Sequence, residues 1–409
     1  MKTEIVIIGG GAAGMLAAGT AAEAGKRVVL VEKNERLGKK LYITGKGRCN
    51  VTNNCPPEEI LQNVPRNGRF LYSSVYGFPP SAMMELLEKW GCALKTERGN
   101  RVFPESDRSA SVIDALRNRM KKYKVHVEQA NVLELLAEDG RITGVRTDKG
   151  DIEAKSVILC TGGCSYPLTG SDGSGYELAR QVGHTIVEPT GSLVPLEENG
   201  NYCAQMQGLA LRNVNVRLIN QKGKTVFEDF GELLFTHFGL SGPTILSASA
   251  HRKKGDTYRI EIDLKPALDE QKLDQRLLRD FEKYQNRDFE NSLGELFNRT
   301  MIPIIVERSG IPGKTKVNSI TREQRRNLLQ LMKHFTIEIS RSRPVEEAIV
   351  TSGGIKVSEI NPKTMESKLV EGLYFAGEVI DVDAYTGGFN LQIAWSTGYA
   401  AAKAAISQA

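Results

Sequence analysis

The chain has 409 residues, of which 40% are hydrophobic and 25% are charged, and its formal net charge is a mild +5. This length exceeds one ordinary hydrophobic core and predicts two or three globular domains, while the absence of an apolar run of about eighteen residues predicts no membrane segment. The six cysteines show neither a paired framework nor zinc-ligand spacing, which indicates reduced thiols in a cytoplasmic protein without disulfides or metal.

The N-terminal segment predicts a strand–helix–strand unit. Residues 4–8 and 27–31 are short apolar runs rich in β-branched side chains, and the Ala-rich segment between them has the apolar spacing of a helix. Helices are then expected at about 80–90 and 109–123, before strands at 125–135, 141–147 and 151–160. The turns at 139–140 and 149–150 indicate an antiparallel β-meander attached to a parallel sheet.

The pattern changes from about residue 190. Long strand-like runs at 211–220, 225–230 and 258–264 lack intervening helices, and helical spacing with charged faces dominates 268–334. One helix there is expected to have Thr321 as its N-cap and Gln324 at its third position, N3, which is the spacing of a capping box. The last sixty residues return to an α/β pattern, with an Ala-rich helix from about Asn390.

We therefore predict an α/β fold in which a Rossmann-like domain with an attached β-meander is interrupted by a β-rich insert domain that carries an all-α subdomain. The predicted ranges are 1–190 and 346–409 for the first domain, 191–266 and 335–345 for the β-rich insert, and 267–334 for the helical subdomain.

A glycine-rich turn between the first strand and helix predicts a dinucleotide site. Gly9 permits a tight turn, Gly11 lets phosphates approach the backbone, and Gly14 lets the helix pack near the sheet; the intervening Ala12 and Ala13 belong to the same site. Glu32, at the end of the second strand and followed by Lys33, would accept hydrogen bonds from an adenosine ribose and repel a 2′-phosphate. The alternative is a structural turn with a solvated carboxylate.

NAD and FAD share the adenosine and pyrophosphate, so segments later in the chain must show which of the two cofactors is bound. Residues 157–163 and 372–378 each form a strand ending in a glycine turn, and they resemble the second and third FAD signatures of the two-dinucleotide-binding-domain flavoproteins. Together with residues 44–53, 235–243 and 386–392, they make nearly the whole chain similar to the HI0933-like family of flavoproteins, also labelled aminoacetone oxidase-like. The resemblance implies non-covalent FAD and an oxidoreductase activity, with family labels reaching to reduction of enone-type steroids.

Several residues are expected to contact the cofactor. They are Gly45, Arg48, Asn50, Val132, Thr161, Gly162, Gly163, Gly377, Glu378, Asp381, Gly388, Asn390, Leu391 and Gln392. Glu378 would hold the ribityl hydroxyls, assisted by Asp381 or Asp383, and the helix near Asn390 would aim its free N–H groups at the flavin pyrimidine edge. The alternative for this last segment is an ordinary glycine turn with Asn390 as N-cap.

Three residues are candidates for catalysis. Lys46 and Arg48 offer donors to an anionic flavin or a substrate carbonyl, although both would also suit a solvated loop. His237, in a Thr-His-Phe-Gly turn, would protonate a substrate carbanion after hydride transfer, although a lone histidine is more often structural.

The leading hypothesis is a cytoplasmic reductase that passes hydride from NAD(P)H through FAD to an electron-poor small molecule such as an enone. Only one full Gly-x-Gly-x-x-Gly is present, so NAD(P)H would dock transiently. Residues 314–343 hold eight Lys or Arg against two Glu, which suits either a flavin-dependent enzyme that modifies nucleic acid, such as tRNA, or, in preference, a solvated basic face. A non-catalytic flavin sensor is the third alternative.

Overall fold

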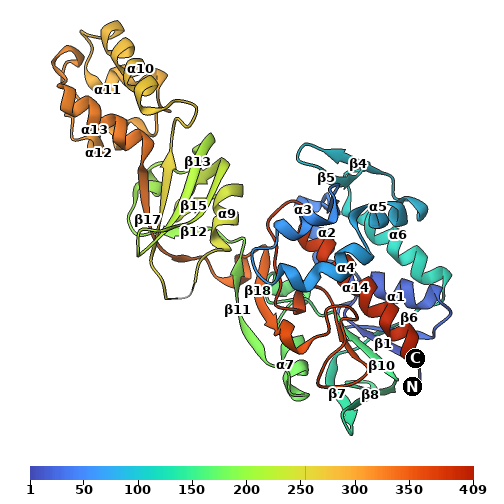
Figure 1. Ribbon diagram of the computed structural model, residues 1–409. Coiled ribbons are helices and arrows are strands. Elements are labelled where there is room, and N and C mark those ends of the chain that lie inside the picture. The colour runs from blue at the N-terminus through green and yellow to red at the C-terminus, as the bar shows by residue number, and fades with distance from the viewer. Residues whose placement is uncertain (254) are drawn as a thin grey trace. The chain divides into compact units, whose positions relative to one another are not determined.

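The computed structural model describes residues 1–253 and 255–409 and divides into two compact units (Figure 1). The first unit comprises Met1–Ser192 and Pro344–Ala409, and the second comprises Leu193–Arg343. Each unit has its own cluster of buried hydrophobic side chains. The finer three-part division into domains stays a prediction.

A five-stranded parallel sheet forms the centre of the first unit. Its order is β19 (Leu373–Phe375), β10 (Ser156–Leu159), β1 (Ile5–Ile8), β2 (Val28–Glu32) and β6 (His126–Gln129). Every residue of β1, β2, β10 and β19 is buried, as expected of a parallel sheet covered on both faces. The predicted Rossmann-like fold class is confirmed, and the two chain ends meet in one sheet.

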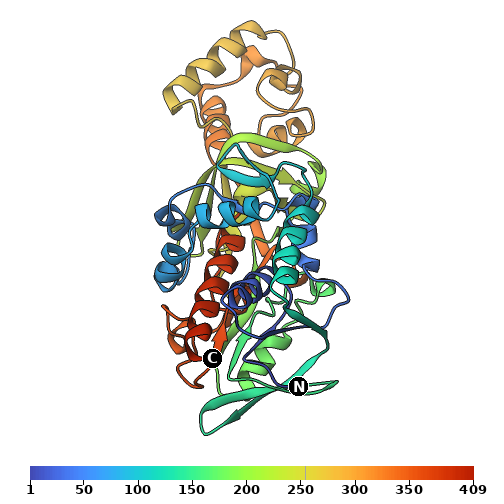
Figure 2. The same cartoon turned by 90° about the vertical axis from the view of Figure 1, so that its right-hand side faces the viewer.

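Helices pack beside this sheet, among them α1 (Ala12–Glu23), α6 (Ser109–Lys122) and α14 (Phe389–Gln408). Figures 1 and 2 both show α14 lying alongside α1. The approach is close because Gly398 of α14 lacks a side chain: a Cβ there would lie 2.7 Å from the carbonyl oxygen of Ala13. The helix expected from about Asn390 therefore exists and begins one residue earlier.

The predicted antiparallel meander is present as β7 (Val132–Glu138), β8 (Arg141–Thr147) and β9 (Gly150–Glu153). Two strand predictions were wrong, however, because each single run is two strands in different sheets. The run 125–135 breaks between β6 and β7, and the run 151–160 breaks between β9 and β10. At the first break the Ala130 N–H bonds the Glu32 carbonyl, so the chain completes the parallel sheet before it enters the meander.

Smaller elements complete the first unit. A three-stranded sheet has the order β3 (Thr52–Asn53), β5 (Arg101–Pro104) and β4 (Leu94–Glu97). The strand β11 (Ile186–Ser192) pairs antiparallel with β18 (Val350–Ile355) where the chain leaves and re-enters the unit. The remaining helices are α2 (Lys39–Ile43), α3 (Pro57–Gln62), α4 (Tyr72–Gly77), α5 (Pro80–Lys89) and α7 (Ser174–Gln181).

The second unit contains a closed barrel, which accounts for its strand-rich sequence. The barrel order is β12 (Leu196–Glu198), β15 (Gly239–Ser241), β14 (Thr225–Phe235), β13 (Ala210–Asn220), β16 (Tyr258–Asp263) and β17 (Phe335–Ser342). Two short helices, α8 (Tyr202–Gln205) and α9 (Pro243–Ser249), accompany it. Closure pairs every strand on both sides and removes exposed sheet edges.

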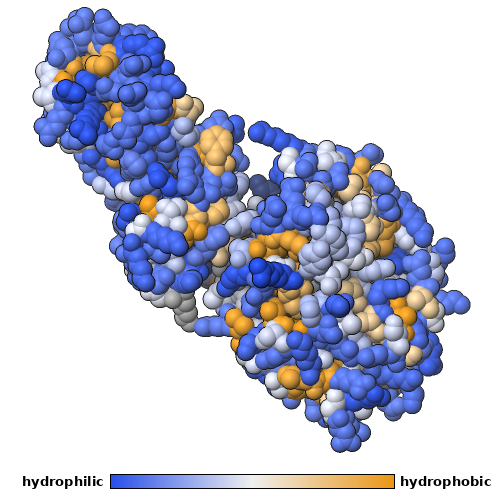
Figure 3. All heavy atoms as spheres, in the orientation of Figure 1, coloured by the Kyte–Doolittle hydropathy of each residue, from blue (hydrophilic) through white to orange (hydrophobic). Residues whose placement is uncertain are grey.

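Four helices between β16 and β17 belong to the same unit. They are α10 (Glu270–Lys283), α11 (Phe289–Ser292), α12 (Ile302–Ser309) and α13 (Arg322–Lys333). The expected capping box at the start of α13 is confirmed: the Gln324 N–H donates to Thr321 Oγ1, and the Thr321 N–H donates to the Gln324 side chain. The face of these helices drawn in Figure 3 is mainly hydrophilic.

The basic stretch 314–343 is largely matched by carboxylates of its own unit. Six of its eight cations form ion pairs, namely Lys314–Glu290, Lys316–Asp288, Arg325–Asp274, Lys333–Asp263, Arg341–Glu197 and Arg343–Glu197. The stretch is therefore less free to attract phosphates than its sequence suggests.

The described residues bear on the expected membrane segment and on the cysteines. Among them, no helix is both long and apolar enough to span a bilayer. All six cysteines are free, and burial raises the pKa of the Cys49 thiol to about 12, which suits packing rather than reactivity.

Candidate dinucleotide site

The glycine turn between β1 and α1 has the geometry of a phosphate loop. Gly9 has a φ of +104°, and a Cβ there would lie 2.6 Å from the Cys160 carbonyl oxygen. A Cβ on Gly14 would lie 1.9 Å from the Gly9 carbonyl oxygen, whereas one on Gly11 would meet open space. Gly11 is the N-cap of α1, whose first turn carries no acidic residue. The free N–H groups of this helix start therefore face a space suited to an anion.

Glu32 lies beside this loop at the end of β2 and is buried. The Gly10 N–H donates to Glu32 Oε2 over 2.6 Å, while the Asn34 N–H and Nδ2 donate to Oε1 over 2.8 and 2.7 Å. These bonds fix the carboxylate against the loop. Since a carboxylate offers about four lone-pair sites, it keeps capacity for a ribose hydroxyl.

The two later signature segments lie against the phosphate loop. The loop Thr161–Gly163 follows β10, and Cys160 just before it contacts Gly9. Gly377 follows β19, and a Cβ there would lie 3.1 Å from the Cβ of Ala13. Three segments far apart in the sequence thus meet at the carboxyl end of the parallel sheet, which is where open α/β folds bind nucleotides.

Glu378 belongs to a network that the sequence did not reveal. Its Oε2 accepts from Lys40 Nζ over 2.6 Å, and its Oε1 accepts from the Thr351 N–H over 2.7 Å and from Ser165 Oγ over 3.1 Å. No periodic signal marks Lys40 or Thr351, because their partner is more than twenty residues away along the chain.

Asp381 and Asp383 differ in the hydrogen bonds that their carboxylates accept from the protein. Asp383 is 1% exposed and accepts hydrogen bonds from Ser192 Oγ and Ser352 Oγ over 2.6 and 2.8 Å. Asp381 accepts from Asn67 Nδ2 over 3.1 Å, and its burial raises the pKa of its carboxyl group. Asp381 is therefore the better candidate to assist a ligand.

The start of α14 presents backbone rather than side chains. Gly388 has a φ of +99° and is the N-cap, so Asn390 is not. The Asn390 side chain instead turns back to bond the Ala384 N–H and carbonyl over 2.9 and 2.7 Å. Gln392 is fully buried, accepts from Thr52 Oγ1 and donates to the Phe78 carbonyl. Half-buried Leu391 packs against the core. The polar side chains of Asn390 and Gln392 therefore hold the fold, while the role of the helix N–H groups toward a flavin stays a prediction.

The two cations of the loop at 44–50, Lys46 and Arg48, lie in different surroundings. Gly45 and Lys46 both have a φ of +58°, and Lys46 is exposed. Arg48 forms ion pairs of 2.5 Å with Glu97 and Asp107, which raise the pKa of its guanidinium, and it lies over the Phe103 ring. These contacts occupy the donors that were expected to face a flavin.

Nine buried polar side-chain atoms have no hydrogen-bond partner among the described residues, and Thr161 Oγ1 and Asn50 Oδ1 are two of them. Buried polar atoms are nearly always paired, so unpartnered ones within a predicted cofactor segment point to a ligand. With the open space at Gly11, they make the residues of this site fit a bound dinucleotide.

A family model described as the HI0933-like protein Rossmann domain matches residues 3–404. The chain belongs to this family.

Two relatives of this HI0933-like chain match it almost end to end. The chain is 31% identical to a 3-dehydro-bile acid delta(4,6)-reductase of Clostridium scindens, over 99% of both chains. It is 30% identical to a ribosomal RNA dihydrouridine synthase of Escherichia coli, over 99% of this chain and 98% of the other. The predicted family and the assignment as an FAD-dependent oxidoreductase are confirmed.

A solved structure shares the fold of this HI0933-like chain. It is the 3-ketosteroid-delta4-(5alpha)-dehydrogenase of Rhodococcus jostii, with a TM-score of 0.54, 14% identity, and coverage of 99% of this chain and 97% of the other. At this identity the likeness supports the fold alone.

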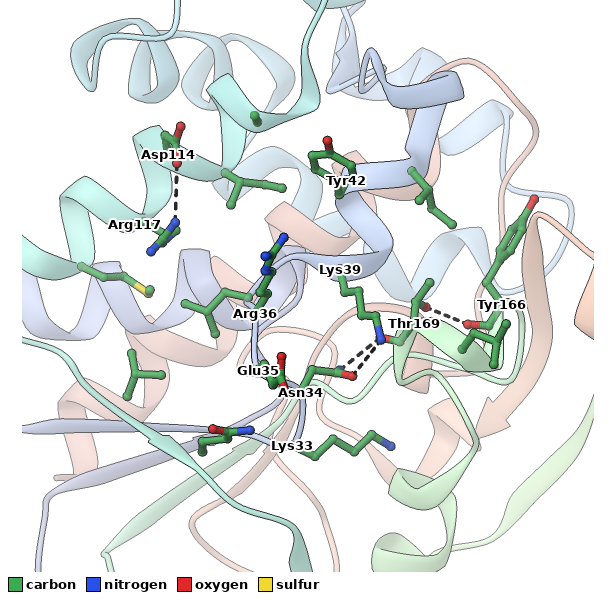
Figure 4. Close-up of a pocket in the computed structure, with 18 of the residues that line it drawn as sticks. Lys33, Asn34, Glu35, Arg36, Lys39, Tyr42, Asp114, Arg117, Tyr166 and Thr169 are labelled. Carbon is green, nitrogen blue, oxygen red and sulfur yellow. Dashed lines mark hydrogen bonds and ion pairs between the residues drawn. The ribbon is translucent and has the colours of Figure 1, made fainter.

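A large groove opens beside Glu32 in the first unit. It has a volume of about 1910 Å³ and is lined by Lys33, Asn34, Lys39, Tyr42 and Tyr166, among others (Figure 4). Lys33 Nζ pairs with Asp172 over 2.7 Å, and Val132 begins β7, half-buried. Contacts of Lys33 and Val132 with an adenosine stay predictions.

His237 lies in the second unit, in the loop between β14 and β15. It is exposed, and its ring contacts the Phe238 ring edge-on. Thr236 Oγ1 accepts from the Gly239 N–H over 3.2 Å and holds the turn closed. The structure thus gives His237 a fixed, accessible loop, and its role as proton donor stays a prediction.

Proposed function

We propose that this protein reduces a carbon–carbon double bond conjugated to a carbonyl group, with electrons taken from NAD(P)H through FAD. The observation that carries the proposal is the meeting of the phosphate loop, Glu32 and the Gly377–Glu378 segment at one edge of the sheet. Bound FAD would supply two-electron hydride chemistry. The names of two relatives agree on the bond type, since a 3-dehydro-bile acid delta(4,6)-reductase and a dihydrouridine synthase both saturate such a double bond.

The residues of this chain would bind the cofactor, orient the acceptor and supply the proton. The N–H groups at the start of α14 would stabilise negative charge near the flavin pyrimidine, and the glycine turns would keep the backbone close to the cofactor. In the acceptor, hydride adds to the carbon remote from the carbonyl, and the adjacent carbon takes a proton. His237 is the proposed source of that proton, and Lys46 is the second candidate.

We favour a cyclic enone of the steroid type as acceptor, and the uracil ring of ribosomal RNA is the second candidate. The second is supported by the Escherichia coli relative and by charge: the second unit carries 24 Lys or Arg against 19 Asp or Glu, which is the whole net charge of +5. The ion pairs of residues 314–343 argue against it. Both acceptors fit a protein acting in the cytoplasm.

Anaerobic reduction tests the proposal. The flavoprotein is mixed with NADH or NADPH, bleaching of the flavin is followed, and the reduced protein is then offered a 3-oxo-Δ4 steroid, a 3-oxo-Δ4,6 bile acid, a quinone, oxygen or a ribosomal RNA fragment. We expect bleaching with at least one nicotinamide and rapid reoxidation by an enone. Failure of both nicotinamides to bleach the flavin would overturn the reductase assignment, and reoxidation by RNA alone would favour the second acceptor.

The role of His237 is tested in the same assay. His237→Asn should bleach at the normal rate and reoxidise with the enone about a hundredfold more slowly, because only the second step needs the proton. His126→Asn, which changes an exposed histidine at the edge strand β6, is the control. Equal reoxidation rates for both variants would exclude His237 as the donor.

A further inference from the structure

The Lys40–Glu378 ion pair is fastened to the phosphate loop from two sides. The Gly38 N–H, just before α2, donates to the Gly10 carbonyl over 2.8 Å, so α2 and Lys40 are tied to the loop. Gly377, just before Glu378, packs against Ala13 at the start of α1. Both contacts place the pair beside the backbone that is shaped for an anion.

The surroundings of this pair are acidic. Burial raises the pKa of Cys164, and the nearby carboxylates Glu378, Asp172 and Glu346 raise it further, while Lys40 lowers it. Asp172 already pairs with Lys33. A diphosphate with two negative charges would therefore meet repulsion from Glu378 unless a cation offset it.

Lys40 has the position and the hydrogen-bonding capacity to do this. Its side chain is 22% exposed, and its ammonium donates to Glu378 Oε2 over 2.6 Å and to Ser165 Oγ over 2.7 Å. An ammonium carries three N–H donors, so these two partners leave one. The neighbouring Lys39 differs, because it is exposed and contacts only the Asn34 side chain, over 3.5 Å, among the interactions described (Figure 4).

We propose that Lys40 is a binding residue for the cofactor's diphosphate. Its ammonium offsets Glu378 and leaves the phosphate loop with the positive potential that a dianion requires, while Ser165 and Thr351 hold Glu378 in place. The inference rests on FAD binding and is independent of the acceptor, so failure of the proposed reductase activity would leave it intact.

The test compares Lys40→Met with Lys39→Met, which removes the same charge one residue away on α2. The full chain is freed of flavin, and its affinity is measured for FAD and, by competition, for ADP and adenosine. Lys40→Met should weaken the binding of FAD and of ADP by about tenfold or more, which is the usual effect of one lost charge-assisted hydrogen bond. The affinity for adenosine should not change. Lys39→Met should lower the affinity for ADP no more than the affinity for adenosine, because Lys39 lines the groove beside Glu32 and does not contact the Lys40–Glu378 pair.

A second variant separates charge from structure. Adding Glu378→Gln to Lys40→Met removes the uncompensated carboxylate and should restore part of the lost ADP affinity, and Lys40→Arg should retain it. The proposal is overturned if Lys40→Met binds ADP as Lys39→Met does. It is also overturned if adenosine is lost in parallel with ADP, because that pattern indicates a damaged fold.

Discussion

A buried hydroxyl group without a partner is a cost that a protein seldom keeps unless a ligand relieves it. Thr161 Oγ1 is such an atom, at the glycine turn after β10. Thr397 in α14 offers a contrast, because its Oγ1 accepts from the Gly377 N–H over 2.9 Å and donates to the Ile393 carbonyl over 2.6 Å. The two threonines should therefore respond oppositely to loss of the hydroxyl.

Thr161→Val should leave the flavin-free protein as stable as before or slightly more stable, because a methyl group of similar size replaces the unpartnered hydroxyl group. FAD affinity should fall by about fivefold to tenfold, the value of one neutral hydrogen bond. Thermal unfolding of the flavin-free protein and fluorescence titration with FAD measure the two effects. The control, Thr397→Val, should cost the flavin-free protein about 1–3 kcal/mol. A comparable loss for Thr161→Val would mean that Thr161 has a protein partner.

Sequence reasoning at the residue scale worked where backbone geometry sets the residue. The requirement for glycine at positions 9 and 14, and for Glu32 at a strand end, follows from local spacing. It did not anticipate side chains that bond a distant partner: Arg48 bonds Glu97 and Asp107, and Lys40 bonds Glu378. Such contacts leave no trace in hydrophobic periodicity, since they depend on which loops the fold brings together.

At the scale of the element, two glycines at the start of α1 are needed for different reasons, one for folding and one for binding. Gly14 is required by the fold, because a side chain there would overlap the Gly9 carbonyl. Gly11 is not, because it has a φ of −84° and open space around its Cβ position. The space at Gly11 is where a phosphate would approach the helix start.

Gly11→Ala should therefore fold with nearly unchanged stability and lose most of its FAD affinity, because the new methyl group intrudes on the ligand and not on the protein. Gly14→Ala should be destabilised by more than about 2 kcal/mol even without flavin, since backbone atoms must move. Denaturant unfolding of the flavin-free variants and FAD titration distinguish them. Similar unfolding free energies for the two variants would contradict this assignment.

Strand boundaries show why element prediction was partly right. The run 141–147 matches β8 because turns bound it on both sides. The runs 125–135 and 151–160 look continuous in the sequence, yet each crosses from one sheet to another. Apolar alternation reports burial of a face and not the identity of the neighbouring strand, so neither break was detectable.

At the scale of the whole molecule, the chain leaves the first unit after Ser192 and returns at Pro344. The flanking strands β11 and β18 pair with each other, with Ser192 opposite Val350. Within the second unit the Arg343 N–H bonds the Pro195 carbonyl over 3.0 Å, so its two ends are also close. Short connections at both ends are typical of a unit inserted into another.

Replacing residues 193–343 with a short Gly/Ser linker should give a protein that still binds FAD, because the phosphate loop, Glu32 and α14 are all retained. It should bleach with a nicotinamide only if that site lies within the first unit, and it should not reoxidise with an enone if His237 is the proton donor. Flavin absorbance and stopped-flow mixing measure these properties. A soluble, folded chain without FAD affinity would show that the second unit contributes to cofactor binding.

The contact between Ala13 and Gly398 also sets an order of events during synthesis. The βαβ unit with the phosphate loop emerges early from the ribosome. The surface on which α14 packs stays uncovered until the second unit and then α14 have been translated. A nascent chain that stops before α14 would expose the apolar side of α1 and hold flavin weakly. Cofactor capture should therefore come late, and truncations of the last helix should act as solubility defects before they act as activity defects.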